Sequence, residues 1–541
     1  MAKSSKVRQL ILSSSSTCCA SSAAQCLSIA LSVGLLSLIL LFELATHSNS
    51  TANLTRISSS SDFNASYTSS SISVSSATIN GSITVKGDDY NVNVSTILEI
   101  MRDHYDLDYD DEMDNFHYLQ VDRKGLNNSS LHVEHQIIKY DESVNKSTNG
   151  SSGPRKEYTK LDRIELGLTQ TRAVIGKAAR HRTHMPDPDY TPQGPIYWNA
   201  AAFQRSYLEM EKSFKVFVYE EGEPPLFHTS HCKSIYAIEG IFFSLMETGN
   251  KFRTKNHDEA HAFFLPFSIA MMVRYIFDEK VRDSSPFDRT INDYINLVGE
   301  RYPYWNRSEG ADHFMVSCHD WGPHESKFNS FLFKNSIRVL CNANTSEGFR
   351  PEKDVTLPEI LLHTGKMGPI GGPSPRHRPI LAFFAGGLHG PIRPILLKHW
   401  KDKDKDMQVY EYLPKDKSYD EMMKKSKFCL CPSGYEVASP RVAEALYIGC
   451  VPVLISEGYV PPFSDVLNWN AFSIIVPPSD IPNLKNILMS ISQRRYLSFQ
   501  KRGQQVRTHF IVNSPPKRYD VFHMLLHSVW LRRLNVRIRS H

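Results

Sequence analysis

Short apolar runs alternate with amphipathic stretches from Phe214 onward, and this alternation constrains the fold more than any other feature of the chain. Runs rich in Val, Ile and Phe are typical of buried strands, and amphipathic stretches are typical of helices. The predicted strands span residues 215–219, 260–267, 313–317, 337–341, 379–385, 407–412, 427–431, 451–455 and 472–476, and the predicted helices span 233–248, 290–302, 392–400, 440–448 and 481–490. Strands separated by helices form parallel sheets with right-handed crossovers, so we predict the doubly wound α/β class.

A Pro/Gly-rich stretch, residues 365–379, interrupts this pattern near its middle. Such a break between two α/β halves predicts two Rossmann-like domains that are joined by a hinge and face a cleft. Ligands of these folds bind at the carboxyl ends of the strands, so the cleft is the expected site.

The N-terminal region predicts a membrane anchor. Residues 9–42 contain no charged side chain, and the apolar part, residues 23–42, is 20 residues long, which suits a membrane-spanning helix. Lys3, Lys6 and Arg8 precede it without an acid, which favours a cytosolic N-terminus. A cleaved signal peptide is the alternative, but the length of the span and the absence of a small-residue cleavage site favour an uncleaved anchor.

The segment after the anchor is typical of a flexible, glycosylated stalk. It is rich in Ser and Asn, a composition that cannot offset its ordering entropy by burial. The chain's N-x-S/T sequons lie mostly there, at Asn49, Asn53, Asn64, Asn80, Asn93, Asn127, Asn128, Asn145 and Asn149, with two more at Asn306 and Asn344.

Cysteine usage excludes a disulfide scaffold and a zinc site, because nine cysteines in 541 residues are too few and none has zinc-ligand spacing. Six cysteines fall in the globular part. Some of them can pair in an oxidising compartment, and others can be small buried hydrophobes inside strands. The sequence does not choose among the pairings.

The most informative motif is CPSGYEVASPRVAEALYIGCVPVLI, residues 431–455. Ser is a preferred N-cap and Pro is favoured at the first helical position, so Ser439 is expected to start a helix whose N-terminus binds an anion. Arg441 adds a phosphate donor, and Glu444, one turn on, can accept hydrogen bonds from ribose hydroxyls. A capped surface helix with an Arg–Glu pair explains the spacing equally well.

A second phosphate candidate is FFAGGLHGPIR, residues 383–393. A strand enters a Gly-rich turn, and a helix begins near Pro391 with Arg393 in its first turn. The backbone amides of Gly386 and Gly387 are candidates for a diphosphate contact. The alternative is a tight connection between a strand and a helix.

A third motif, HFMVSCHDWGPHES, places titratable residues after a predicted strand. Asp320 is the candidate general base, with burial against Trp321 expected to raise the pKa of its carboxyl, and His324 is the second choice. A loop with satisfied histidines is the structural alternative.

Together these motifs resemble the exostosin-like glycosyltransferases of plants (family 47), over about residues 214–529. The resemblance rests on residues 215–219 with the following Gly–Glu–Pro–Pro, on CHDWGPH, on FFAG…R and on the long motif at 431–455. It implies a type II Golgi membrane protein of GT-B fold that uses a nucleotide-sugar donor, usually UDP-linked, with inversion. It also implies that Ser439, Arg441 and Glu444 contact the donor, with Gly386 and Arg393 nearby.

With this resemblance the chain divides into seven predicted segments. They are a cytosolic tail (1–22), a membrane anchor (23–42), a disordered glycosylated stem (43–160), a helical neck (161–212), an N-terminal acceptor domain (213–370), a C-terminal donor domain (371–510) and a basic C-terminal helix (511–541).

Neither a metal nor another cofactor is expected. The D-x-D pairs that metal-dependent transferases place after a strand occur here only in the stem, at Asp187/Asp189 in a Pro-rich loop, and in the charge run 401–406. Arginines and a helix N-terminus can replace the metal's charge.

The expected partners are a nucleotide-sugar, a polysaccharide or glycan acceptor and the membrane, and a homo-oligomer or a hetero-oligomer with other transferases is a further option. The basic C-terminus, with 11 Lys/Arg against one acid in residues 492–541, is expected to form solvated helices or to attract an acidic polysaccharide, and not to bind nucleic acid. Two other functions fit the sequence, a catalytically silent subunit of a transferase complex and a stalked lectin-like glycoprotein.

Overall fold

The computed structural model describes residues 158–278, 280–281 and 283–539. The predicted anchor and stem lie outside these residues. Within them, no helix is long and apolar enough to cross a membrane.

The first sheet has six parallel strands in the order β2-β1-β3-β4-β5-β6. Its strands are β1 (Val216–Val218), β2 (Arg253–Thr254), β3 (Ala262–Phe264), β4 (His313–Ser317), β5 (Ile337–Leu340) and β6 (Val355–Thr356). The helices before and within this half are α4 (Lys160–His181), α5 (Ala200–Ser213), α6 (Ala237–Glu247), α7 (Ile269–Ile276), α8 (Ser285–Arg301), α9 (Pro303–Ser308), α10 (Gly322–Glu325) and α11 (Ser330–Lys334).

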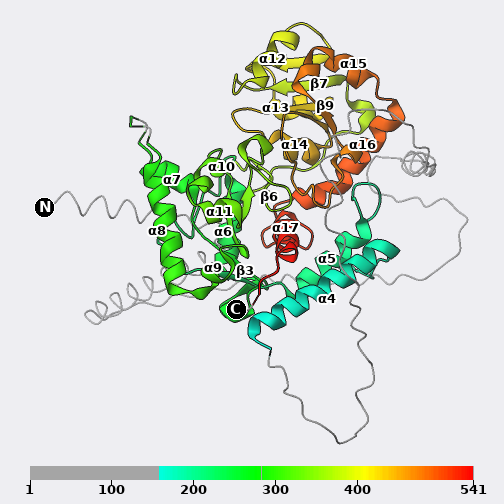
Figure 1. The fold of residues 1–541 in the computed structure, drawn as a ribbon. Coiled ribbons are helices and arrows are strands. Elements are labelled where there is room, and N and C mark those ends of the chain that lie inside the picture. The colour runs from blue at the N-terminus through cyan, green and yellow to red at the C-terminus, as the bar shows by residue number, and fades with distance from the viewer. Residues whose placement is uncertain (1–157, 279, 282, 540–541) are drawn as a thin grey trace, which may run out of the picture. The chain divides into compact units, whose positions relative to one another are not determined.

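The second sheet has five parallel strands in the order β11-β10-β9-β7-β8. Figure 1 labels β7 and β9 of this sheet. Its strands are β7 (Ile380–Ala385), β8 (Met407–Tyr410), β9 (Ser426–Pro432), β10 (Val451–Ile455) and β11 (Ile474–Val476). Its helices are α12 (Ile392–Trp400), α13 (Tyr419–Lys424), α14 (Arg441–Ile448), α15 (Leu484–Met489) and α16 (Gln493–Val506), and α17 (Val521–Asn535) follows. The predicted α/β class with parallel sheets is confirmed.

The inner strands are mostly apolar, as is typical of parallel strands that are buried on both faces. All residues of β1, β3, β4, β5 and β10 are buried. The predicted strands at 313–317 and 451–455 match β4 and β10. The two-residue strands β2 and β6 were not predicted, because two residues carry no periodic signal.

The segment predicted as a neck is packed into the globular unit. Phe203 and Tyr207 of α5 are buried in the same hydrophobic cluster as the strands of the first sheet, and Leu168 of α4 belongs to it as well. The ring of Tyr207 stacks on that of Tyr519 at 3.9 Å between ring centroids. We therefore assign α5 to the hydrophobic core, although the sequence had predicted it as part of the helical neck.

The basic C-terminal segment also differs from the prediction of solvated helices. Every residue of α17 is buried except Leu531 and Asn535. Arg532 pairs with Asp465 at 3.0 Å, and Arg533 pairs with Glu165 at 2.6 Å. These buried arginines pair with partly buried carboxylates from distant parts of the chain, so their charge is not displayed for an acidic ligand.

Candidate functional site

The loops at the carboxyl ends of the two sheets contact each other. After β5 and β10, the amide of Thr345 donates to the carbonyl of Gly458 at 2.9 Å, and that of Val460 donates to the carbonyl of Ala343 at 3.0 Å. At the end of β6, the hydroxyl of Thr356 donates to the carbonyl of Val460 at 2.9 Å. These contacts bring together the ends at which α/β sheets bind ligands.

Two arginines lie at the carboxyl ends of β7 and β9. Arg393 is in the first turn of α12, as predicted, and its Nη1 donates to the carbonyl of Gly387 at 3.4 Å. Arg441 begins α14, and its Nη2 donates to the carbonyl of Ala385 at 2.9 Å while the guanidinium lies over the ring of Phe384.

Among the described residues, neither Arg393 nor Arg441 has a carboxylate partner within ion-pair distance. Burial, with the charge of Arg441 as the second cause, lowers the pKa of Arg393 to about 10. The Nε atoms of Arg393 and Arg441 are buried, and neither has a hydrogen-bond partner in the described part of the chain. Planar guanidinium groups with unused donors match the oxygens of a diphosphate.

Two glycines between these arginines, Gly386 and Gly390, provide space for close packing. The amide of Gly386 donates to the carbonyl of Tyr410 at 3.1 Å, so it is not available to a ligand as the sequence suggested. A Cβ on Gly386 would lie 2.6 Å from Nη2 of Arg441. Gly390 has φ +68°, and a Cβ there would lie 1.8 Å from the carbonyl oxygen of Gly434. Only glycine allows the two loops to pack this closely.

Ser439 does not cap α14. The helix begins at Arg441 with Pro440 as its N-cap and without a side-chain capping bond. The hydroxyl of Ser439 instead accepts a hydrogen bond from Nη1 of Arg441 at 3.2 Å. Ser439 and Arg441 therefore lie together as predicted, but Ser439 orients the guanidinium.

Glu444 lies on the same helix and receives a hydrogen bond from the hydroxyl of Tyr419 at 3.1 Å. Burial raises the pKa of Glu444, and the positive charge of Arg441 opposes that change. Gly449, in the left-handed conformation, ends the helix directly after the predicted span 440–448.

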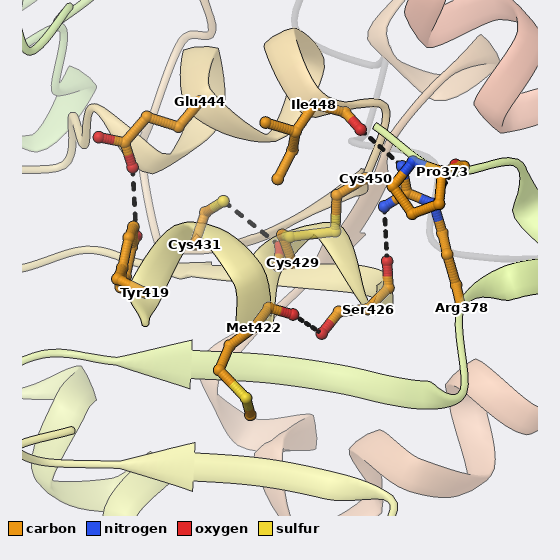
Figure 2. The surroundings of a disulfide bond; sticks show 10 residues. All are labelled: Pro373, Arg378, Tyr419, Met422, Ser426, Cys429, Cys431, Glu444, Ile448 and Cys450. Carbon is orange, nitrogen blue, oxygen red and sulfur yellow. Dashed lines mark hydrogen bonds between the residues drawn. A yellow bond between two sulfur atoms is a disulfide. The ribbon is translucent and has the colours of Figure 1, made fainter. Parts of the chain in front are cut away.

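A disulfide holds the strand that leads into this region (Figure 2). It joins Cys429 of β9 to Cys450, which directly precedes β10. Beside it, Arg378 donates to the carbonyl of Ser426 at 3.0 Å and to that of Ile448 at the end of α14. These contacts fix β9 against α14, and hence the position of Arg441.

Asp320 lies at the end of β4 in the other half. The disulfide Cys318–Cys341 joins the residues that directly follow β4 and β5. The hydroxyl of Tyr236 donates to Oδ1 of Asp320 at 2.7 Å, and the side-chain amide of Asn342 donates to the backbone carbonyl of Asp320 at 2.9 Å. The loop that carries Asp320 is therefore held on both sides.

His324 and Trp321 do not share the environment of Asp320 that the sequence suggested. Nδ1 of His324 lies 3.0 Å from the carboxylate of Glu325, and its side chain is 61% exposed. The indole of Trp321 packs against the ring of Phe277 at 4.8 Å between ring centroids. The described contacts thus join Asp320 to Tyr236 and place His324 in a separate pair.

Two glutamates that the sequence reasoning missed face the same region. Glu359 follows β6 and is 4% exposed, and Glu436 follows β9 and is 7% exposed. Burial and then the charge of Asp320 raise the pKa of Glu359 to about 8, while Arg441 and Arg393 lower it. Glu436 stands within the motif at 431–455, so its neighbourhood was visible, whereas Glu359 follows a strand too short to predict.

Four of the five D-x-D carboxylates in the described residues, all except Asp402, are engaged in ion pairs. Asp404 and Asp406 pair with Lys485 at 2.6 and 3.0 Å. Asp187 and Asp189 pair with Arg518 at 2.8 and 2.6 Å. These carboxylates neutralise the partly buried cations Lys485 and Arg518.

Comparisons with known proteins agree with the resemblance. The family model of the exostosin GT47 domain matches residues 210–491. A probable glycosyltransferase of Arabidopsis thaliana is 62% identical over 401 residues, which cover 74% of this chain and 77% of that protein. The probable β-1,4-xylosyltransferase IRX10 of Arabidopsis thaliana is 26% identical over 58% of this chain and 81% of its own length. The solved structure of Anabaena HepE with UDP and glucose matches 58% of this chain and 97% of its own at 8% identity, and its TM-score of 0.28 is too low to support an argument.

Proposed function

The chain belongs to the exostosin GT47 family of glycosyltransferases, and on that premise we propose that it transfers a sugar from a UDP-linked donor to a cell-wall polysaccharide or glycan with inversion. The observation that supports a nucleotide-sugar donor is the pair Arg393 and Arg441, which lie at the carboxyl ends of one sheet without an ion-pair partner among the described residues. The two facing sheets suit a GT-B arrangement, with the donor on the second sheet.

In the proposed reaction, the acceptor hydroxyl oxygen attacks the anomeric carbon and Asp320 takes its proton. The bond from that carbon to the diphosphate breaks, and its electron pair leaves with the diphosphate. Arg393 and Arg441 neutralise the charge that develops on the leaving group, which is the largest contribution an active site of this kind makes. Glu444 binds the ribose hydroxyls, and Ser439 orients Arg441.

We predict that Arg441→Ala weakens UDP binding by about 1.5–3 kcal/mol, the usual contribution of a hydrogen bond to a charged group. Glu444→Gln should weaken it as well and leave the fold intact. Calorimetry in excess chelator measures both, because the proposal uses no metal and expects the parent to bind UDP under these conditions.

Arg494→Ala, at an exposed position of α16, is the matched control and should bind UDP like the parent. If Arg441→Ala and Glu444→Gln also bind UDP like the parent, the donor site is wrongly assigned. Loss of UDP binding by the parent in chelator, restored by manganese, would contradict the metal-independent mechanism.

We place the protein in the Golgi membrane, with one span and a lumenal catalytic part. The support is the apolar segment 23–42, its basic flank and the sequons after it. The two disulfides also suit an oxidising compartment. Removal of N-glycans from the protein expressed in plant cells should increase its gel mobility, and an unchanged band would contradict this location.

A further inference from the structure

Three carboxyl groups from loops that are far apart in the sequence lie close enough for their charges to interact. Asp320 follows β4, Glu359 follows β6, and Glu436 follows β9. Asn342 donates to the backbone carbonyl of Asp320 and accepts from the amide of Val437, next to Glu436. One oxygen each of Glu359 and Glu436, Oε2, is buried, and neither oxygen has a hydrogen-bond partner among the residues that the structure describes. A buried carboxyl oxygen without a partner is costly, so it indicates a site that is completed by a ligand or a proton.

The charges around Glu359 come from both halves of the molecule. Asp320 and Glu444 raise its pKa, whereas Arg441 and Arg393 lower it. The other ionisable groups that interact with Glu359 are Tyr236 before α6, Glu436, and Tyr459 after β10.

Burial and the charges of Glu359 and Asp320 raise the pKa of Glu436 well above its usual value. Neighbouring carboxylates in such a site cannot all be ionised, so the cluster holds protons near neutral pH.

A diphosphate between Arg393 and Arg441 changes this balance. The two arginines are the groups that favour the ionised form of Glu359. A bound diphosphate neutralises them and adds negative charge, so it favours the neutral form of that carboxyl. Protonation of Glu359 is therefore linked to occupation of the donor site.

Resting on the proposed function, we propose that Glu359 is a further positioning residue of the active site: its carboxyl becomes fully protonated when the donor's diphosphate occupies Arg393 and Arg441, and so adds no negative charge beside Asp320, which accepts the proton of the acceptor hydroxyl. The neutral Glu359 then adds no repulsion against the diphosphate. Its carboxyl, like that of Glu436, can donate a hydrogen bond as well as accept one.

The test is calorimetry of UDP binding at pH 8 in two buffers of different ionisation enthalpy, which gives the number of protons taken up per UDP. Burial raises the pKa of Glu359 to about 8, so part of the free protein carries an ionised Glu359 at this pH, and we expect the parent to take up a fraction of a proton per UDP. Glu359→Gln should bind UDP without this uptake, Glu359→Asp should retain part of it, and Glu352→Gln, at an exposed position of the same segment, should match the parent.

The outcomes separate this inference from the proposed function. UDP binding by the parent without proton uptake, or equal uptake by Glu359→Gln, overturns the inference and leaves the donor site in place. Failure of the parent to bind UDP overturns both. Gln has the shape of a neutral Glu, so Glu359→Gln is expected to fold, and its thermal unfolding is compared with that of the parent at pH 6, where both side chains are uncharged.

Discussion

Replacing Asp320 by Asn is expected to lower turnover by about 100-fold or more, the usual loss when a general base is removed. Asn keeps the shape of the side chain and can still accept the hydrogen bond from Tyr236, but it cannot take the proton of the acceptor hydroxyl. The affinity for UDP should stay close to that of the parent, because Arg393 and Arg441 are untouched. Turnover is measured with the donor that a panel of UDP-sugars identifies, and UDP affinity by calorimetry.

His324→Ala is the matched control, because it removes the other titratable candidate of the same loop. His324 pairs with Glu325 and has a largely exposed side chain, so its loss should change turnover little. Near-normal turnover in Asp320→Asn together with inactive His324→Ala would transfer the role of base to His324. Two active variants would remove the loop from catalysis.

Removal of the Cys429–Cys450 disulfide, by replacing both residues with Ala, should lower the free energy of unfolding by about 3 kcal/mol. The bond closes a loop across 21 positions of the sequence, and a cross-link of that span removes a corresponding entropy from the unfolded chain. Denaturant unfolding of the non-reduced protein measures the change. Because the bond holds β9 against the end of α14, UDP binding should weaken as well.

Cys431→Ala is the control for this second experiment. Cys431 is buried two residues from Cys429 and is free, and burial raises the pKa of its thiol to about 12. Its replacement removes a small apolar group without removing a cross-link, so the loss should be roughly 1 kcal/mol. Equal losses in the two experiments would mean that packing around β9, and not the disulfide, provides the stability.

The sequence alone was sufficient for the elements that have a local signal. Strands at 313–317 and 451–455 and the helix at 392–400 occur at the predicted residues. Burial on both faces favours runs of mostly apolar residues in such strands, and an amphipathic helix repeats apolar residues on its buried face at every turn. The family could also be identified, because the long motif at 431–455 is continuous in the chain.

Only the tertiary structure decided which distant residues meet. The pairing of the cysteines, the burial of α17 and the position of Glu359 beside Asp320 and Arg441 depend on chain segments that are tens to hundreds of residues apart. The strand-to-helix turn at Ser439 was visible in the sequence, but whether its hydroxyl caps the helix or binds Arg441 depends on Ala385, which holds the same guanidinium from β7. Local sequence determines the period of burial, whereas the environment of a charge depends on every segment that packs around it, and that environment sets the chemistry of this site.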